Sequence, residues 1–159
     1  MAQYEGFQIE KTVGYVVNRA ALAIKTDLVR RFKEARVDDV TPETWIILNR
    51  LWEKAGLSQN ELADLTIKDK TTVTRILSRM MRTKLVRRIK DKTDSRLNRL
   101  YPTDKANRLK VKLIPIAKVV LEEATKDIKQ QDLMVAIQVL KQIEKNLSPL
   151  NENLRGKNV

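Results

Sequence analysis

The chain contains no cysteine and no histidine. It therefore lacks thiolate and imidazole groups, the usual ligands of zinc, and the side chain that serves most often as a general base. Zinc hydrolases, Ser–His–Asp hydrolases and Cys–His proteases are excluded by this composition alone. A sensor of oxidants that works through a thiol is excluded as well. We expect a protein that is not an enzyme and that uses no metal and no cofactor.

Aromatic residues and long apolar runs are also scarce. The 159 residues include 2 Trp, 3 Tyr and 2 Phe, too few for a surface that stacks the bases of single strands. No apolar run approaches the ~18 residues that a membrane span needs. Residues 1–11 contain two glutamates and no apolar stretch typical of a signal peptide. We therefore expect a cytoplasmic protein without membrane contact, and its 42% hydrophobic residues can build an ordinary core.

The positive charge is concentrated in one part of the chain. The whole sequence has 32 Lys and Arg against 20 Asp and Glu, a net charge of +12. Residues 68–112 alone hold 16 basic and 4 acidic residues, so they carry all of this excess. Such concentration indicates a polyanion as partner. Nucleic acid fits better than a membrane surface, because Tyr101 is the only aromatic residue in the segment.

Apolar residues at spacings of three and four predict a mainly helical chain. The predicted helices cover residues 9–32, 42–54, 59–65, 69–83, 104–129 and 133–147. Capping signals support them: Thr41 precedes a proline, Ser58 and Glu61 form a capping box, and Asp69 precedes the fourth helix. Gly56 is expected to end the second helix as its C′ residue.

The helix predicted at 69–83 has one apolar face and one cationic face. Ile76, Leu77 and Met80 fall within ~60° of Val73 at ~100° per residue, which defines a buried face. The other side carries Lys68, Thr71, Arg75, Ser78 and Arg82, with Thr74 and Arg79 at its flanks. Such a face fits the major groove of DNA, where arginine bonds guanine and a threonine methyl contacts thymine. An ordinary solvated face is the alternative, and a short capped helix at helix-turn-helix spacing before it favours DNA.

Two short strands are expected next, over residues 85–90 and 97–101, with a polar tip at 91–96. The cations of this ribbon are Arg87, Arg88, Lys90, Lys92, Arg96 and Arg99. Asp94 precedes Arg96 by two residues, close enough for its carboxylate to orient that guanidinium. A ribbon beside such a helix can reach a minor groove, where arginine favours narrow AT-rich stretches. A solvent-exposed ion pair of little energetic value is the alternative.

Several short segments share their order and spacing with a known family. They are residues 57–63, 70–75 and 85–88, followed by Asp91, Asp94, Arg96 and residues 103–105. In these segments the chain resembles the winged helix-turn-helix of the multiple-antibiotic-resistance regulator (MarR) family of transcription factors. The resemblance implies a mainly α fold with a small two- or three-stranded β-wing and flanking dimerisation helices. The chain departs from the family at Lys84, where a glycine usually ends the helix, and at Pro102, which we expect to end the second strand early.

The resemblance also implies how the chain is divided. Residues 1–36 and 104–147 would form a helical dimerisation region, residues 37–103 a DNA-binding lobe, and residues 148–159 a flexible tail. A homodimer would place two recognition helices about one turn of DNA apart, so its operator would be pseudo-palindromic. The apolar faces of the outer helices fit such pairing, although a single chain could also fold them on themselves.

The charge pattern and the resemblance together predict a sequence-specific transcriptional repressor that binds double-stranded DNA as a homodimer. The residues expected at the DNA are Lys68, Lys70, Thr71, Thr72, Thr74, Arg75, Ser78, Arg79, Arg82, Arg88, Lys92, Asp94, Ser95 and Arg96. Family members commonly respond to a small aromatic acid, but no residue identifies a small-molecule effector here. Tyr15, Arg19 and Trp45 could line an effector cleft, although aromatic residues at helical spacing more often belong to a core.

Two other functions share these features. An architectural or RNA-binding winged-helix protein would carry the same charge without having an operator. Selection from random duplexes would then give little base preference. A metal-responsive repressor would have only carboxylates as ligands, which makes it the weaker alternative.

Overall fold

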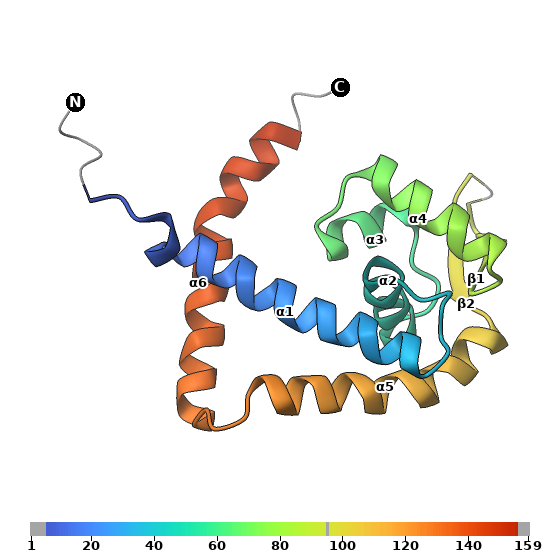
Figure 1. Cartoon of the computed structure of the whole chain (residues 1–159). Helices are drawn as coiled ribbons and strands as arrows, with labels where there is room; N and C mark the ends of the chain where they lie inside the picture. Colours follow the sequence, from blue (N-terminus) through green and yellow to red (C-terminus); the bar gives the residue numbers. More distant parts are fainter. Residues whose placement is uncertain (1–5, 95, 156–159) are drawn as a thin grey trace. The chain divides into compact units, whose positions relative to one another are not determined.

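The computed structural model describes residues 6–94 and 96–155, with side chains as far as residue 147. The chain falls into two compact units that divide between Leu121 and Glu122. The elements of the described residues, shown in Figure 1, are η2 (Ile9–Lys11), α1 (Val13–Glu34), α2 (Pro42–Glu53), α3 (Gln59–Thr66), α4 (Lys70–Arg82), β1 (Val86–Lys90), β2 (Asn98–Pro102), α5 (Asp104–Ala124) and α6 (Gln130–Arg155). The mainly helical fold with a small β-wing that the sequence predicts is confirmed.

Three helices begin at the residues that the sequence marks as caps. The hydroxyl of Thr41 accepts a backbone N–H three residues on at 3.3 Å and caps α2. At the start of α3, Ser58 and Glu61 form the expected capping box, with N···O distances of 3.2 and 2.7 Å. The carboxylate of Asp69 accepts a backbone N–H at 2.7 Å and caps α4. Local sequence therefore determines where these helices start.

Several helices end in a non-glycine residue with a left-handed backbone. Lys84 follows α4 with φ +57°, and Arg36 follows α1 with φ +56°. After α4 the N–H of Lys84 bonds to the carbonyl of Met81 at 3.1 Å, and the N–H of Leu85 bonds to that of Met80 at 2.8 Å. This is the Schellman arrangement, in which glycine is the usual residue at the position of Lys84. The departure from the family at Lys84 therefore coincides with a strained backbone.

The end of α2 differs from what we expected of Gly56. Lys54, directly after α2, is extended (φ −144°, ψ 104°), so Gly56 is not the C′ residue of this helix. Gly56 instead has φ +81° in the turn between α2 and α3, and its N–H bonds to the carbonyl of Leu100 at 2.8 Å. A Cβ atom there would lie 3.1 Å from the hydroxyl of Tyr101. The turn and the close approach of β2, rather than helix termination, require glycine.

The wing is a two-stranded antiparallel ribbon whose register pairs Val86 with Pro102. We expected Pro102 to end the second strand early, and this is wrong: β2 includes Pro102 as its last residue. The N–H of Thr103 bonds to the carbonyl of Leu85 at 3.1 Å, and hydrogen-bonded and non-hydrogen-bonded pairs alternate along such a ribbon. Val86 and Pro102 are thus a non-hydrogen-bonded pair, where the missing N–H of proline costs nothing. Leu57 adds an isolated bridge to β2.

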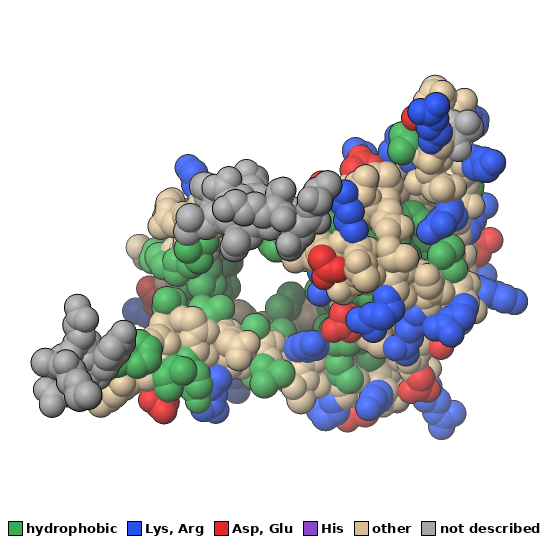
Figure 2. Space-filling model, turned by 90° about the horizontal axis from the view of Figure 1, so that it is seen from above, with side chains coloured by type: hydrophobic (Ala, Val, Ile, Leu, Met, Phe, Trp, Pro, Cys, Tyr) green, Lys and Arg blue, Asp and Glu red, His purple; other side chains and the backbone are tan. Residues whose placement is uncertain are grey.

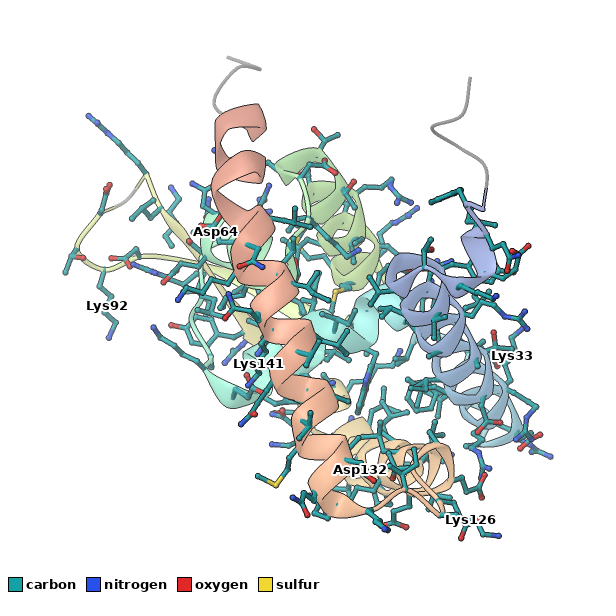
Figure 3. All side chains as sticks on the ribbon, turned by 90° about the vertical axis from the view of Figure 1, so that its left-hand side faces the viewer. Lys33, Asp64, Lys92, Lys126, Asp132 and Lys141 are labelled. Atoms are coloured by element: carbon teal, nitrogen blue, oxygen red, sulfur yellow. The ribbon has the colours of Figure 1, made fainter. Side chains whose placement is uncertain are left out.

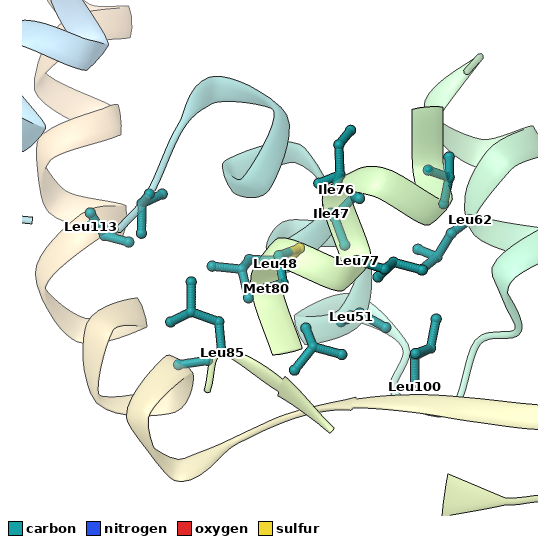
Figure 4. Packing of buried hydrophobic residues seen from close by; sticks show 14 of the residues in the cluster. Ile47, Leu48, Leu51, Leu62, Ile76, Leu77, Met80, Leu85, Leu100 and Leu113 are labelled. Atoms are coloured by element: carbon teal, nitrogen blue, oxygen red, sulfur yellow. The ribbon is translucent and has the colours of Figure 1, made fainter. Parts of the chain in front are cut away.

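The core of the first unit gathers apolar side chains from all of its α-helices and from the ribbon. In Figure 4, residues of α2, α4, β2 and α5 point toward one another. The inner face predicted for α4 is confirmed, because Val73, Ile76, Leu77 and Met80 are each at most 6% exposed. Burial of a large apolar side chain contributes about 1.5–3 kcal/mol. This packing holds α4 in place and turns its other face outward.

The second unit contains the last residues of α5 and the whole of α6. α6 continues to Arg155, beyond residue 147 where we expected the last helix to end. Its apolar residues recur at helical spacing, and Ile137, Leu140 and Leu147 are 45%, 41% and 50% exposed. In the described part of the chain, no helix has both the length and the apolar character that crossing a membrane requires.

Candidate nucleic-acid interface

Helices α3 and α4 form a helix-turn-helix. α3 ends at Thr66; the next residue, Ile67, has a left-handed backbone (φ +53°), and Asp69 caps α4 two residues after Ile67. The amide of Gln59 on α3 donates a hydrogen bond of 2.5 Å to the hydroxyl of Thr74 on α4. The short turn and this contact fix α4 against α3, as the motif requires.

The face of α4 opposite the core is exposed and bears the cations that the sequence places there. The exposed residues of this face are Thr71, Thr74, Arg75, Ser78, Arg79 and Arg82, and Lys70, the first residue of the helix, is exposed as well. Lys68, before the helix, and Thr72 are half-buried. A surface with long cations and short hydroxyls can bond both phosphates and the edges of bases.

Three hydroxyls of α4 bond within the helix or its cap. Thr72 donates to the carboxylate of Asp69 at 2.6 Å, so it supports the cap of α4. Thr74 donates to the carbonyl of Lys70 at 2.8 Å, and Ser78 donates to the carbonyl of Thr74 at 2.9 Å. A hydroxyl also has acceptor lone pairs. These bonds therefore orient the groups without preventing a further contact.

In the wing, the structure corrects the geometry that we expected of Asp94. Its carboxylate accepts the backbone N–H of Arg96 at 2.9 Å, and in the described part of the wing it forms no ion pair with the Arg96 guanidinium. In a tight turn the nearest donor is a backbone amide, while a long side chain extends into solvent. Arg96, Arg88 and Lys92 are exposed, and Figure 3 shows Lys92 projecting from the wing loop. Ser95 lies outside the described residues.

Asp91 organises the wing more than Asp94 does. One carboxylate oxygen of Asp91 accepts the N–H groups of Thr93 at 2.8 Å and of Asp94 at 3.1 Å, and the other accepts Nε of Arg99 at 2.6 Å. Hydrogen bonds from the Thr93 hydroxyl and from Arg99 lower the pKa of the Asp91 carboxyl well below its ordinary value. Arg99 also contacts Glu61 on α3, with Nη1 3.1 Å from Oε2. Local patterns gave no sign of this last pair, because 38 positions separate its members.

Helix α4 and the wing both belong to the winged-helix lobe, the name that we give to residues 37–103. Figure 2 shows blue Lys and Arg side chains gathered over this part of the molecule, with fewer red carboxylates among them. Between the start of α3 and the ribbon lies a depression of about 180 Å³, lined in part by Ser58, Gln59, Asn60, Arg88, Arg96 and Asn98. Guanidinium groups beside small polar side chains suit an anion such as a DNA phosphate.

The residues considered for an effector cleft lie in different surroundings. Trp45 packs against the core, with its ring centre 5.4 Å from that of Phe32, as expected of a core residue. Tyr15 is half-buried on α1 and does not belong to the core cluster. The guanidinium of exposed Arg19 lies 5.9 Å from the centre of the Tyr15 ring. Among the described residues, no group of acidic side chains is arranged to hold a metal ion.

Sequence comparison connects the helix-turn-helix to one family. Residues 38–97, which include α2, α3, α4 and β1, match the sequence model of the MarR family. The HTH-type transcriptional regulator TtmR of Methylorubrum extorquens (strain PA1) is 35% identical over 75 residues, which are 47% of this chain and 38% of that protein. The match spans less than half the length of the curated relatives.

Solved structures share the fold over most of the chain. The transcriptional repressor CouR, bound to a 23-mer DNA duplex, has a TM-score of 0.76 at 20% identity, covering 86% of this chain and 94% of that one. BpsR of Bordetella bronchiseptica, whose structure concerns the regulation of its DNA binding by 6-hydroxynicotinic acid, has a TM-score of 0.78 at 17% identity. That match covers 87% of this chain and 96% of that one. At sequence identities this low, the structural similarity shows that the fold is shared and nothing about function.

Proposed function

Because the chain belongs to the MarR family of winged-helix transcriptional regulators, we propose that it regulates transcription by sequence-specific binding to double-stranded DNA. The observation that carries this proposal is the exposed cationic face of α4 beside a cationic wing. Residues 68–112, which contain both, hold the whole net charge of +12. α4 would enter the major groove, and the wing would reach the adjacent minor groove.

The proposed contacts divide into those that read bases and those that position the protein. Arg75, exposed on the outer face of α4, is proposed to read a base edge, and Arg96 is proposed to enter the minor groove. Asp94 would shape the turn that presents Arg96. The other contacts are proposed for Lys68, Lys70, Thr71, Thr72, Thr74, Ser78, Arg79, Arg82, Arg88, Lys92 and Ser95. Most would reach phosphates, which supply affinity without sequence preference.

The proposal includes a homodimer. On α1 the apolar side chains of Val13, Val16 and Leu22 are 56%, 53% and 57% exposed. Rows of exposed apolar residues indicate a partner, and α6 carries a similar row. A second copy of the chain would cover these faces and would present a second α4 about one DNA turn away. The operator would then be pseudo-palindromic.

We also propose that the protein is a repressor that a small molecule can release. CouR is a transcriptional repressor, and the BpsR structure concerns control of DNA binding by 6-hydroxynicotinic acid. A dimer bound at a promoter would block transcription. A ligand that binds better to the free form than to the DNA-bound form would lower the affinity for the operator by the same coupling factor.

Selection of bound sequences from a pool of random duplexes tests the proposal. We expect a pseudo-palindrome with half-sites about one turn apart. Arg75→Ala should cost roughly 1–3 kcal/mol on the selected duplex and relax base preference at one position in each half-site. The control is Lys141→Ala, which lies on α6 and outside residues 68–112. It should keep the base preference of the parent protein. A pool without enrichment, or tighter binding to RNA, would contradict the proposal and favour an architectural or RNA-binding protein.

A further inference from the structure

Arg99 lies on β2 between two carboxylates from different parts of the lobe. Its Nε donates to Asp91 at 2.6 Å, and its Nη1 donates to Glu61 at 3.1 Å. A longer hydrogen bond joins Nη1 to the carbonyl of Gly56 at 3.4 Å. The Arg99 side chain is 30% exposed. One guanidinium therefore connects the wing, α3 and the turn that precedes α3.

Both carboxylate partners organise the segment around them. Oε2 of Glu61, which accepts Arg99, also accepts the N–H of Ser58 in the capping box of α3. Asp91 accepts the N–H and the hydroxyl of Thr93 in the turn of the wing, and its side chain is only 13% exposed. A displacement of Arg99 would therefore disturb the start of α3 and the turn of the wing together.

The outer half of the ribbon has little else to hold it. In β1 only Val86 is buried, and the other four residues are exposed. In β2 only Leu100 is buried. An isolated two-stranded ribbon is marginally stable in water, so the orientation of its far end depends on contacts outside the ribbon. The pairs of Arg99 supply such contacts.

We propose that Arg99 is a positioning residue, which holds the wing at a fixed orientation to α3 and thereby sets where Arg96 meets the minor groove. The inference rests on the proposed function, because it concerns how the wing meets DNA. Arg99 lies within residues 68–112, which carry the net positive charge, yet its guanidinium is directed to carboxylates of the protein. The planar fork of arginine can hold two carboxylates at once, whereas the ammonium of lysine is a single point of charge.

Asp91→Asn is the most informative variant, because it makes the protein more positive. Charge alone predicts tighter binding to DNA. Loss of the Asp91–Arg99 pair predicts weaker binding instead, by about tenfold on a selected duplex with AT-rich flanks, where minor-groove contacts count most. On GC-rich flanks the loss should be smaller, and the base preference of α4 should not change. Arg99→Gln should give the same pattern.

Matched controls separate position from charge. Asp64→Asn removes an exposed carboxylate of α3 that does not contact Arg99. This variant should bind DNA as tightly as the parent or more tightly. Arg99→Lys keeps the charge without the fork and should not restore binding to AT-flanked duplexes. The double variant of Asp91→Asn and Arg99→Gln should bind no more weakly than either single variant, because the two residues act through one contact.

Any one of three results would overturn the inference. The first is that Arg99→Lys binds like the parent in every duplex, and the second is that Asp91→Asn tightens binding as Asp64→Asn does. The third is that Arg99→Gln reduces the salt slope by about 0.9, as loss of a phosphate contact would. If the parent selects no sequence, the proposed function fails, and hydrogen exchange in the free protein decides the inference. Arg99→Gln should then speed exchange of the Asp94 and Arg96 amides, and unchanged exchange would overturn it.

Discussion

Lys105, in the first turn of α5, donates a hydrogen bond of 2.9 Å to the carbonyl of Thr83, the residue that follows α4. The same Nζ lies 2.6 Å from a carboxylate oxygen of Asp39, in the connection between α1 and α2. The last carbonyls of a helix carry a partial negative charge, so a cation is favourable at this place. One side chain thus joins three segments at the C-terminal end of the helix that we propose to read DNA.

Replacing Lys105 with methionine should lower the free energy of unfolding by about 1 kcal/mol, because a half-exposed charged contact is lost and Asp39 loses its partner. Urea denaturation measures the change. Lys118→Met, at an exposed position of the same helix, is the control and should shift stability by less than about 0.5 kcal/mol. Equal shifts in the two variants would show that Lys105 does not hold the end of α4.

Replacing Lys84 with glycine should stabilise the protein by up to about 1 kcal/mol. Its φ of +57° is unfavourable for a residue with a Cβ atom. Relief of this penalty should exceed the entropy that glycine adds to the unfolded chain. Lys84→Ala removes the same charge but keeps the Cβ atom, and it should give no such gain. A similar gain from both variants in urea denaturation would assign the effect to charge instead of backbone strain.

The affinity for the selected duplex should fall linearly with salt on logarithmic axes. Arg79→Ala and Arg88→Ala should each reduce the slope by about 0.9, because each would remove one phosphate contact. Lys141→Ala and Lys145→Ala change charges outside residues 68–112 and should leave the slope as it is. Binding titrations at several salt concentrations measure it. Equal changes from both pairs would mean that the concentration of charge along the chain does not mark the binding face.

Asp91 should make the protein sensitive to acid. Hydrogen bonds from the Thr93 hydroxyl and from Arg99 lower its pKa in the folded protein below the ordinary value of 3.8, so folding favours the ionised form. The stabilisation is complete above the pKa of the unfolded chain and is lost as the pH falls through the lower folded value. Between about pH 5 and pH 3 the parent should therefore lose more stability than Asp91→Asn. Denaturation at each pH measures this, and parallel losses would contradict it.

Helix α4 is the part of the fold that the sequence predicts best. Its inner face follows from the spacing of Val73, Ile76, Leu77 and Met80, since burial at period 3.6 leaves little choice of orientation. Its start follows from Asp69, a cap that acts over only three residues. The outward placement of Arg75 is then a geometric consequence. Structural features that depend on residues close together in the sequence can therefore be predicted from the sequence.

The contacts of the wing are less readable. The partners of Arg99 include Glu61, 38 positions away, and no local pattern brings these two together. Asp94 was expected to orient a guanidinium, but the amide of Arg96 is the nearer donor in the turn. Gly56 looked like a helix terminus, because the approach of β2 that requires it depends on the tertiary fold. In each case a partner distant in the sequence, or a competing backbone group, decides the geometry.

Thr103 is the single residue between β2, which ends at Pro102, and α5, which begins at Asp104. Its N–H bonds to the carbonyl of Leu85 at 3.1 Å as in a strand, and its hydroxyl accepts the N–H of Ala106 at 3.3 Å as in a helix cap. The connection between β2 and α5 therefore contains no residue that is free of both elements. One inserted residue would turn the side chains of α5 by about 100° relative to the ribbon. Any rotation of α5 about its axis would therefore pass to β2 as torque, with no hinge between them to absorb it.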